Sequence, residues 1–197
     1  MFGSKMTISQ SFGLFLLVAI VLTAMPWRFV RAVEVGSLIK TADASAVYYV
    51  DADGTRHAFP DAQVFFSWYE DFSGVQVITD NQMAARPLGR NVVYRPGTFW
   101  IKIQSLPNVY AVGRGGEIRW IESEEAARRL SNTTQWASRV RDVPDTFFFD
   151  YTIGNSIAVD KIAEGYDGLV YDVGEDSLIV WDGQRRELSG DAWSQNR

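Results

Sequence analysis

The chain has 197 residues and a formal net charge of −5. Apolar residues make up 47% and charged residues 22%, which excludes a disordered chain and allows a core for one domain or two small ones. The excess of acidic residues argues against nucleic acid or an anionic lipid surface as a partner. The chain has no cysteine, so no disulfide stabilises its fold, whereas aromatic residues are frequent at 14%.

The first 32 residues have the pattern of an export signal. Lys5 is followed by no charge until Arg28, and the centre of this segment reads SFGLFLLVAIVLTAM. Small or apolar residues occupy the −3 and −1 positions of a cleavage site after Ala32. We therefore expect residues 1–32 to be a signal peptide, with an uncleaved membrane anchor as the alternative, because residues 6–27 are uncharged and nearly long enough to span a bilayer. In both cases the rest of the chain lies outside the cytoplasm, secreted or anchored.

One pattern, a Val-Tyr strand followed by a polar turn and a second apolar strand, occurs three times. It reads VYYVDADGTRHAF from Val47, VYAVGRGGEIRWI from Val109 and VYDVGEDSLIVWD from Val170. The spacings are 62 and 61 residues, and a fixed period of this kind is typical of a repeated supersecondary unit. We predict an α+β protein built from two full units and a truncated third unit or cap: residues 33–96, 97–153 and 154–197.

Each unit is expected to begin with a three-stranded β-meander. The first strand follows a glycine, at 38–40, 99–103 and 157–159. The second strand is the Val-Tyr strand, and the turn after it leads into the third strand, which covers 55–59 in the first unit.

A short helix should follow each meander. Asp61 and Ser123 stand at equivalent positions, and both residue types are good N-caps. The apolar stripe of the first helix consists of Val64, Phe65, Trp68 and Phe72. The third unit is too short for a full copy and is expected to end as a cap with little or no helix.

Six short motifs mark the two full units. They are Val-Tyr, Phe-Pro, Trp-Tyr-x-Asp-Phe, Pro-Leu-Gly, Tyr-Arg-Pro-Gly-Thr and Arg-Trp-Ile, at 47–48, 59–60, 68–72, 87–89, 94–98 and 119–121. With these motifs, residues 36–154 resemble a repeat module of exported proteins from candidate-phylum (Parcubacteria-like) bacteria. The resemblance implies an envelope or surface setting and brings no catalytic residues with it, because that module has no assigned activity. Residues 155–197 depart from its usual pattern.

Asp51 and Asp53 resemble the start of a calcium-binding loop. The later ligands are missing, since Thr55 and Ala62 stand at positions five and twelve. The equivalent turns of the other units contain no such pair. A hairpin turn is therefore favoured over a metal site, and no cofactor is expected.

His57 is the single histidine of the chain. A nucleophilic site would need this imidazole beside a serine or a cysteine, and cysteine is absent. Arg119 and Val180 occupy its place in the other units. We therefore expect His57 to be a strand residue that faces solvent.

The aromatic residues are the candidates for ligand contacts, because exposed Trp and Tyr rings stack on sugars. Trp120 and Trp181 recur in register and are expected in the core. The candidates for ligand binding are Trp68, Tyr69, Trp100 and Trp193, of which Tyr69 lies off the apolar stripe of its helix.

We therefore expect a non-catalytic protein of the cell envelope or surface that binds wall glycan or a protein partner and contacts a membrane only through residues 1–32. One alternative is a structural spacer with no defined ligand. Another is a hydrolase that uses Asp or Glu, suggested by Glu70 and Asp71 near Asp61. Adjacent residues of a helix point in different directions, so Glu70 and Asp71 fit a solvated helix end better than a catalytic pair.

Overall fold

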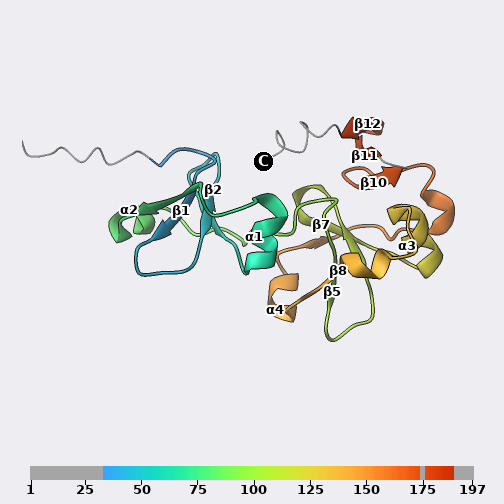
Figure 1. Ribbon diagram of the computed structural model, residues 1–197, viewed down its shortest axis with the longest axis horizontal. Coiled ribbons are helices and arrows are strands. Elements are labelled where there is room, and N and C mark those ends of the chain that lie inside the picture. The colour runs from blue at the N-terminus through green and yellow to red at the C-terminus, as the bar shows by residue number, and fades with distance from the viewer. Residues whose placement is uncertain (1–32, 174–175, 189–197) are drawn as a thin grey trace, which may run out of the picture. The chain divides into compact units, whose positions relative to one another are not determined.

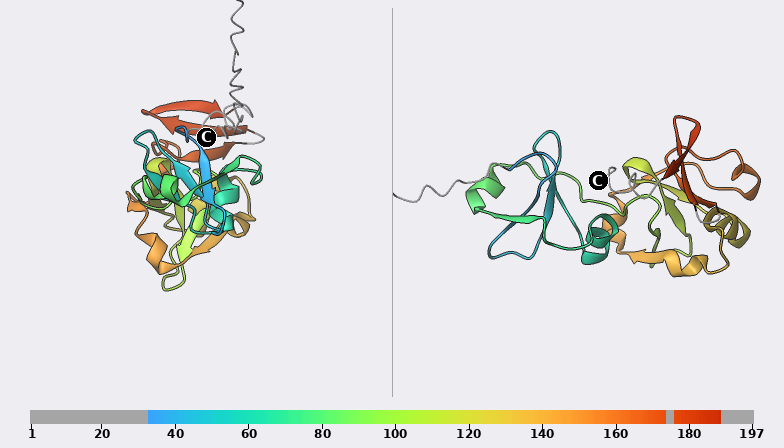
Figure 2. Two further views of the ribbon diagram at one scale, coloured as in Figure 1. Left: turned by 90° about the vertical axis from the view of Figure 1, so that its left-hand side faces the viewer. Right: turned by 45° about the horizontal axis from the view of Figure 1, so that its top comes forward.

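The computed structural model describes residues 33–173 and 176–188. Within them the protein is α+β, with three small sheets and four α-helices (Figures 1 and 2). The signal-peptide prediction for residues 1–32 and the candidate Trp193 lie outside the described residues. No helix in the described part of the chain combines the length and the apolar character needed to cross a bilayer.

The first sheet has the strand order β3-β2-β1-β4. β1 (Leu38–Thr41) pairs antiparallel with β2 (Tyr48–Val50), which pairs antiparallel with β3 (Arg56–Ala58), and this meander confirms the prediction. β4 (Val75–Ile78) was not expected and pairs parallel with β1. A parallel pair needs a long crossover connection, which β2, β3 and the first helix provide.

α1 (Ala62–Trp68) begins where the sequence predicts. The Asp61 carboxylate accepts a hydrogen bond from the Val64 amide at 2.9 Å, which satisfies an amide that has no partner inside the helix. The helix ends at Trp68, before the end of the predicted apolar stripe. Phe72 therefore lies in the loop after α1, where its ring stacks on Phe65 with centroids 4.3 Å apart.

The second sheet has the strand order β8-β5-β6-β7-β9. Its strands are β5 (Trp100–Ile103), β6 (Tyr110–Val112), β7 (Glu117–Trp120), β8 (Val140–Val143) and β9 (Thr152–Ile153). β5, β6 and β7 form an antiparallel meander, and β8 pairs parallel with β5 as β4 pairs parallel with β1. α3 (Glu124–Ser131) follows β7 and begins at the predicted cap Ser123, whose hydroxyl accepts the Ala126 amide at 3.1 Å.

The meanders of the two sheets have the same register. In the first, Tyr49 of β2 lies opposite His57 of β3. In the second, Ala111 of β6 lies opposite Arg119 of β7, and both residues stand 62 positions later in the chain (111 against 49, 119 against 57).

The segments that follow α1 and α3 also correspond, but equivalent residues there stand 65 positions apart and not 62. Arg56 of β3 forms a parallel bridge with Leu88, and Ile118 of β7 pairs parallel with Ile153, so the second partner stands 65 positions later (153 against 88). α2 (Asp80–Ala84) follows β4 and α4 (Asp145–Phe148) follows β8 at this same offset (145 against 80). The extra three residues therefore lie between the start of the helix and the fourth strand.

The third sheet differs from the other two. It is an antiparallel meander of β10 (Val170–Val173), β11 (Asp176–Trp181) and β12 (Gln184–Leu188), and the third of these strands was not expected. The predicted strand at 157–159 is wrong: Ile157 forms an isolated bridge with Ile121, and a 3-10 helix covers Val159–Lys161. The backbone there continues the edge of the second sheet, since the Ile157 amide donates to the Trp120 carbonyl at 2.7 Å.

The buried residues form three clusters. The largest joins apolar side chains of the first two sheets, a second joins α3 to the third sheet, and a small third lies beside α2. Trp120, which the repeat pattern places in the core, is 39% exposed, so this prediction is wrong. Trp120 is the last residue of β7, so its side chain projects from the end of the strand and not from the interior of the sheet.

Candidate functional site

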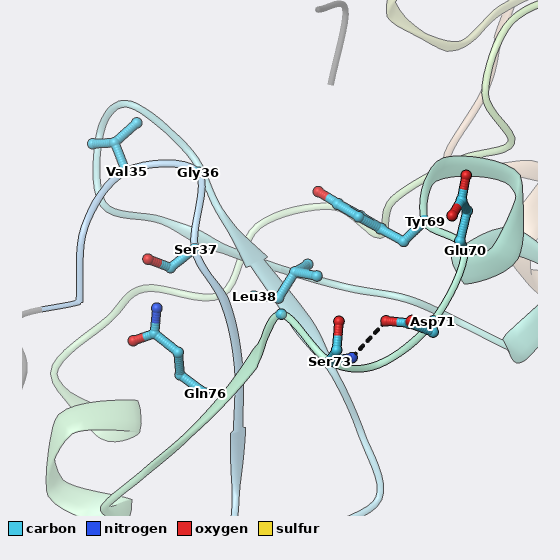
Figure 3. Close-up of a pocket in the computed structure, with 10 residues that line it drawn as sticks. Val35, Gly36, Ser37, Leu38, Tyr69, Glu70, Asp71, Ser73 and Gln76 are labelled. Atoms are coloured by element: carbon cyan, nitrogen blue, oxygen red, sulfur yellow. Dashed lines mark hydrogen bonds between the residues drawn. The ribbon is translucent and has the colours of Figure 1, made fainter. Parts of the chain in front are cut away.

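A hollow of about 490 Å³ lies between the start of β1 and the loop after α1 (Figure 3). We call it the polar hollow, and it is lined by Val35, Gly36, Ser37, Leu38, Tyr69, Glu70, Asp71, Ser73, Gly74 and Gln76. Carboxylate, carboxamide and hydroxyl groups surround it, and Tyr69 contributes the single aromatic ring among the residues that line it. Its size lies within the range of sites for small molecules.

Tyr69 is held at the end of α1 by its backbone and by its ring. Its amide donates to the Phe65 carbonyl at 3.1 Å, and its own backbone is extended, so the chain leaves the helix here. The ring packs against Phe65 and Phe59, with centroids 5.3 Å and 6.0 Å away. Tyr69 is therefore half-buried, and Figure 3 shows its ring reaching from the end of α1 over the polar hollow.

Glu70 and Asp71 lie in the loop beyond α1 and not on the helix end. The Ser73 amide donates to Asp71 Oδ1 at 2.8 Å. Hydrogen bonds from the Ser73 side chain and amide hold the pKa of Asp71 below its ordinary value of 3.8. Asp71 is therefore ionised at neutral pH and is a hydrogen-bond acceptor among the residues that line the polar hollow.

A second hollow, of about 300 Å³, also has Tyr69 in its wall. We call it the aromatic hollow, and it is lined by Tyr49, Asp51, His57, Phe59, Trp68, Tyr69, Asn91, Val92 and Val93. Trp68, the other candidate of this segment, donates from its indole nitrogen to the Val93 carbonyl at 2.7 Å. This bond fixes the ring in the wall between α1 and the segment that follows α2.

The sequence predicts that His57 faces solvent. The structure instead places it in the wall of the aromatic hollow, with its side chain 25% exposed. Nδ1 donates to the Arg90 carbonyl at 2.7 Å, and Nε2 lies 3.0 Å from Asp51 Oδ2. When it is protonated, an imidazole donates at both nitrogens, and His57 then forms an ion pair with Asp51. The partner Arg90 comes from a distant loop, which is why strand periodicity alone misplaced the ring.

Asp51 is also the organising residue of the β2–β3 turn. Its Oδ1 accepts the Asp53 and Thr55 amides at 3.0 and 2.9 Å. The hydrogen bond from His57, and then those amides, lower the pKa of Asp51 below 3.8. Both carboxylate oxygens thus have donors from the protein. In the described residues no three Asp, Glu or His side chains gather as a metal site would require.

The remaining aromatic candidates lie elsewhere. Trp100 is 5% exposed and packs near Trp136 in the core, with centroids 6.3 Å apart, so its ring offers little surface to a ligand. Trp181 is partly exposed, with the Arg114 guanidinium 3.8 Å from its ring centroid.

Sequence reasoning missed Ser37, Gln76 and Val93, which line the two hollows. The parallel pairing of β1 with β4 brings Gln76 beside the start of β1, opposite Ile39. No sequence motif marks these residues, because their role depends on which strands become neighbours.

No protein-family model, curated protein or solved structure matches the chain.

Proposed function

We propose that this chain is an exported protein of the cell envelope or surface, that residues 33–96 and 97–153 are two copies of one module, and that the protein binds cell-wall glycan without catalysis. Two observations support the two-copy interpretation. The first two sheets share a strand order, and equivalent residues stand 62 positions apart in the meanders and 65 positions apart in the segments after α1 and α3. Residues 1–32 would direct export or hold the protein at the membrane.

The observation that carries the glycan proposal is the composition of the polar hollow. An aromatic ring stacks on the apolar face of a sugar, and carboxylate and carboxamide groups accept or donate hydrogen bonds to its hydroxyls. The polar hollow offers Tyr69 for the first contact and Asp71 and Gln76 for the second. Figure 3 shows these side chains around one open space.

Asp71 itself does not suit the role of the general acid in hydrolysis. A glycosidase needs one carboxyl group with a raised pKa as general acid, opposite a second carboxylate. The pKa of Asp71 is instead lowered by Ser73. An ionised acceptor favours binding over proton donation.

Isothermal titration with soluble cell-wall oligosaccharides tests the proposal. Asp71→Asn should weaken binding about tenfold, because a hydrogen bond to a charged acceptor contributes about 1.4 kcal/mol or more. Asparagine keeps an oxygen for the Ser73 amide, so the loop should remain folded. Asp53→Asn makes the same charge change outside the polar hollow and should leave the affinity unchanged.

Three outcomes would count against the proposal. Absence of binding to any wall oligosaccharide would favour the structural spacer. Release of reducing sugar during the titration would favour a hydrolase. Equal loss of affinity in Asp71→Asn and Asp53→Asn would show a general charge effect and would remove the polar hollow from consideration.

A further inference from the structure

The second sheet contains a close counterpart of the wall formed by His57. Arg119 stands 62 positions after His57 and pairs with Glu117 at 2.6 Å, as His57 pairs with Asp51 at 3.0 Å. Arg119 also donates to the carbonyl of Asn155 at 3.3 Å. Asn155 stands 65 positions after Arg90, whose carbonyl accepts from His57 (155 against 90). Each wall therefore joins a basic side chain to a backbone carbonyl and to an acid, although the acids Asp51 and Glu117 stand at different positions of the two meanders.

In the second sheet a tyrosine ring lies beside this wall. The Arg119 guanidinium lies 5.4 Å from the centroid of the Tyr166 ring. The Tyr166 hydroxyl accepts a hydrogen bond from the Ala158 amide at 3.2 Å. Tyr166 also packs against the cluster that contains Leu130 and Ile121. One ring is thus recognised by a cation, by an amide donor and by apolar side chains.

In the first sheet the corresponding groups surround the aromatic hollow, and no described residue fills it. Val93 stands 65 positions before Ala158, and its amide makes no hydrogen bond to any other described residue. His57 takes the place of Arg119, and Phe59 and Trp68 take the places of Ile121 and Leu130. By this correspondence the aromatic hollow has an amide donor without a partner among the described residues, the imidazole of His57 and larger apolar walls.

We propose that the aromatic hollow binds the side chain of an exposed tyrosine of a partner protein. The phenol ring lies against Trp68 and beside His57, and its hydroxyl accepts a hydrogen bond from the Val93 amide. Tyrosine is a common anchor of protein interfaces because it buries a large rigid ring and keeps one polar group. This inference rests on the proposed equivalence of the two modules and is independent of glycan binding.

A sugar fits the aromatic hollow less well. A sugar ring carries several hydroxyl groups, each of which needs a partner when it is buried. The side chains of Asp51 and His57 already bond to each other, and the Asn91 carboxamide donates to Asp150 at 2.8 Å. Among the described residues neither the Val93 amide nor the Tyr49 hydroxyl makes a hydrogen bond, and these two groups suit one phenol hydroxyl better than the several hydroxyls of a sugar.

The test uses the whole protein and two peptides that differ in one oxygen atom, acetyl-Gly-Tyr-Gly-amide and acetyl-Gly-Phe-Gly-amide. Titrations are followed by two-dimensional NMR of the backbone amides. The tyrosine peptide should shift the Val93 resonance and should bind about fivefold more tightly than the phenylalanine peptide, because the latter cannot accept the amide hydrogen bond. This comparison needs no variant of the protein and is unaffected by misfolding.

Tyr49→Ala tests the wall of the hollow. Alanine is the residue that the second sheet has at this position, Ala111, so the strand should tolerate it. The variant should bind the tyrosine peptide about fivefold more weakly. Tyr48→Ala, on the opposite face of the same strand, is the matched control and should keep the affinity of the unchanged protein; thermal melting of both variants verifies folding.

Two results would overturn the inference. One is equal affinity for the two peptides with no shift at Val93. The other is a Val93 shift caused by wall oligosaccharide and not by the tyrosine peptide, which would assign the aromatic hollow to glycan. Loss of glycan binding in Asp71→Asn with intact binding of the tyrosine peptide would separate this site from the polar hollow.

Discussion

Gly89 is the position where a single methyl group should disturb the His57 wall most directly. A Cβ atom at residue 89 would lie 2.5 Å from His57 Cε1, 2.8 Å from His57 Nδ1 and 2.9 Å from Thr55 Cγ2. Carbon atoms in contact are normally about 3.5–4.0 Å apart, so the imidazole cannot keep its place. Gly89→Ala should therefore break the hydrogen bond from His57 to the Arg90 carbonyl.

The backbone has little freedom to relieve this clash. The Gly89 amide donates to the Arg56 carbonyl at 2.9 Å, and the Arg56 amide donates to the Pro87 carbonyl at 2.9 Å, so the segment is attached to β3 on both sides. Overpacking of this kind typically costs about 1–3 kcal/mol, and we expect Gly89→Ala to lower the free energy of unfolding by an amount in that range. Urea denaturation followed by circular dichroism measures it.

Two controls isolate the cause. Gly74→Ala adds the same methyl group where the nearest atom, Leu38 Cδ1, is 4.0 Å away, and it should change the free energy of unfolding by less than about 0.5 kcal/mol. In a protein that already carries His57→Ala, Gly89→Ala should lower the free energy of unfolding by less than it does in the unchanged protein, because the imidazole ring that the new methyl group would overlap is absent. A cost for Gly89→Ala no larger than that for Gly74→Ala would refute the reasoning.

Two further predictions concern residues 33–96. The pKa of Asp51 is lowered in the folded protein, chiefly by the hydrogen bond from His57. The ionised carboxylate should therefore stabilise the fold fully above pH 3.8, and this stabilisation should be lost as the pH falls through the lower pKa of the folded state. In urea denaturation at a series of pH values, Asp51→Asn should reduce this loss of stability at acid pH, the acid limb of the profile. Thr79 and Gln82 form a capping box at the start of α2, with the Gln82 amide 3.3 Å from the Thr79 hydroxyl, so Thr79→Ala should lower the free energy of unfolding by about 1 kcal/mol in the same assay.

Matched substitutions serve as controls for both. Asp53→Asn removes a neighbouring exposed carboxylate that does not contact His57 and should leave the acid limb unchanged; the same flattening in both variants would contradict the role given to Asp51. Thr152→Ala, at an exposed position of β9, removes a hydroxyl that caps no helix. Equal losses of stability in Thr79→Ala and Thr152→Ala would mean that the capping box contributes nothing measurable.

The sequence by itself determined the features that depend on neighbours in the chain. The turn that begins at Asp51, the helix starts at Asp61 and Ser123, and the Val-Tyr strands all form close to where their residue patterns predict. Caps and tight turns consist of hydrogen bonds between residues two to four positions apart. Such bonds are encoded by the residues that make them.

Only the tertiary structure decided the features that depend on distant segments. β4 and β8 pair parallel with strands more than thirty residues away, and nothing in VQVI or VRDV distinguishes such a strand from an apolar turn segment. Ile157 joins the edge of the second sheet and so leaves the third sheet without the predicted first strand. The two hollows arise in the same way, because His57 meets Arg90 and Gln76 lies beside β1 only after these strands and loops have packed together.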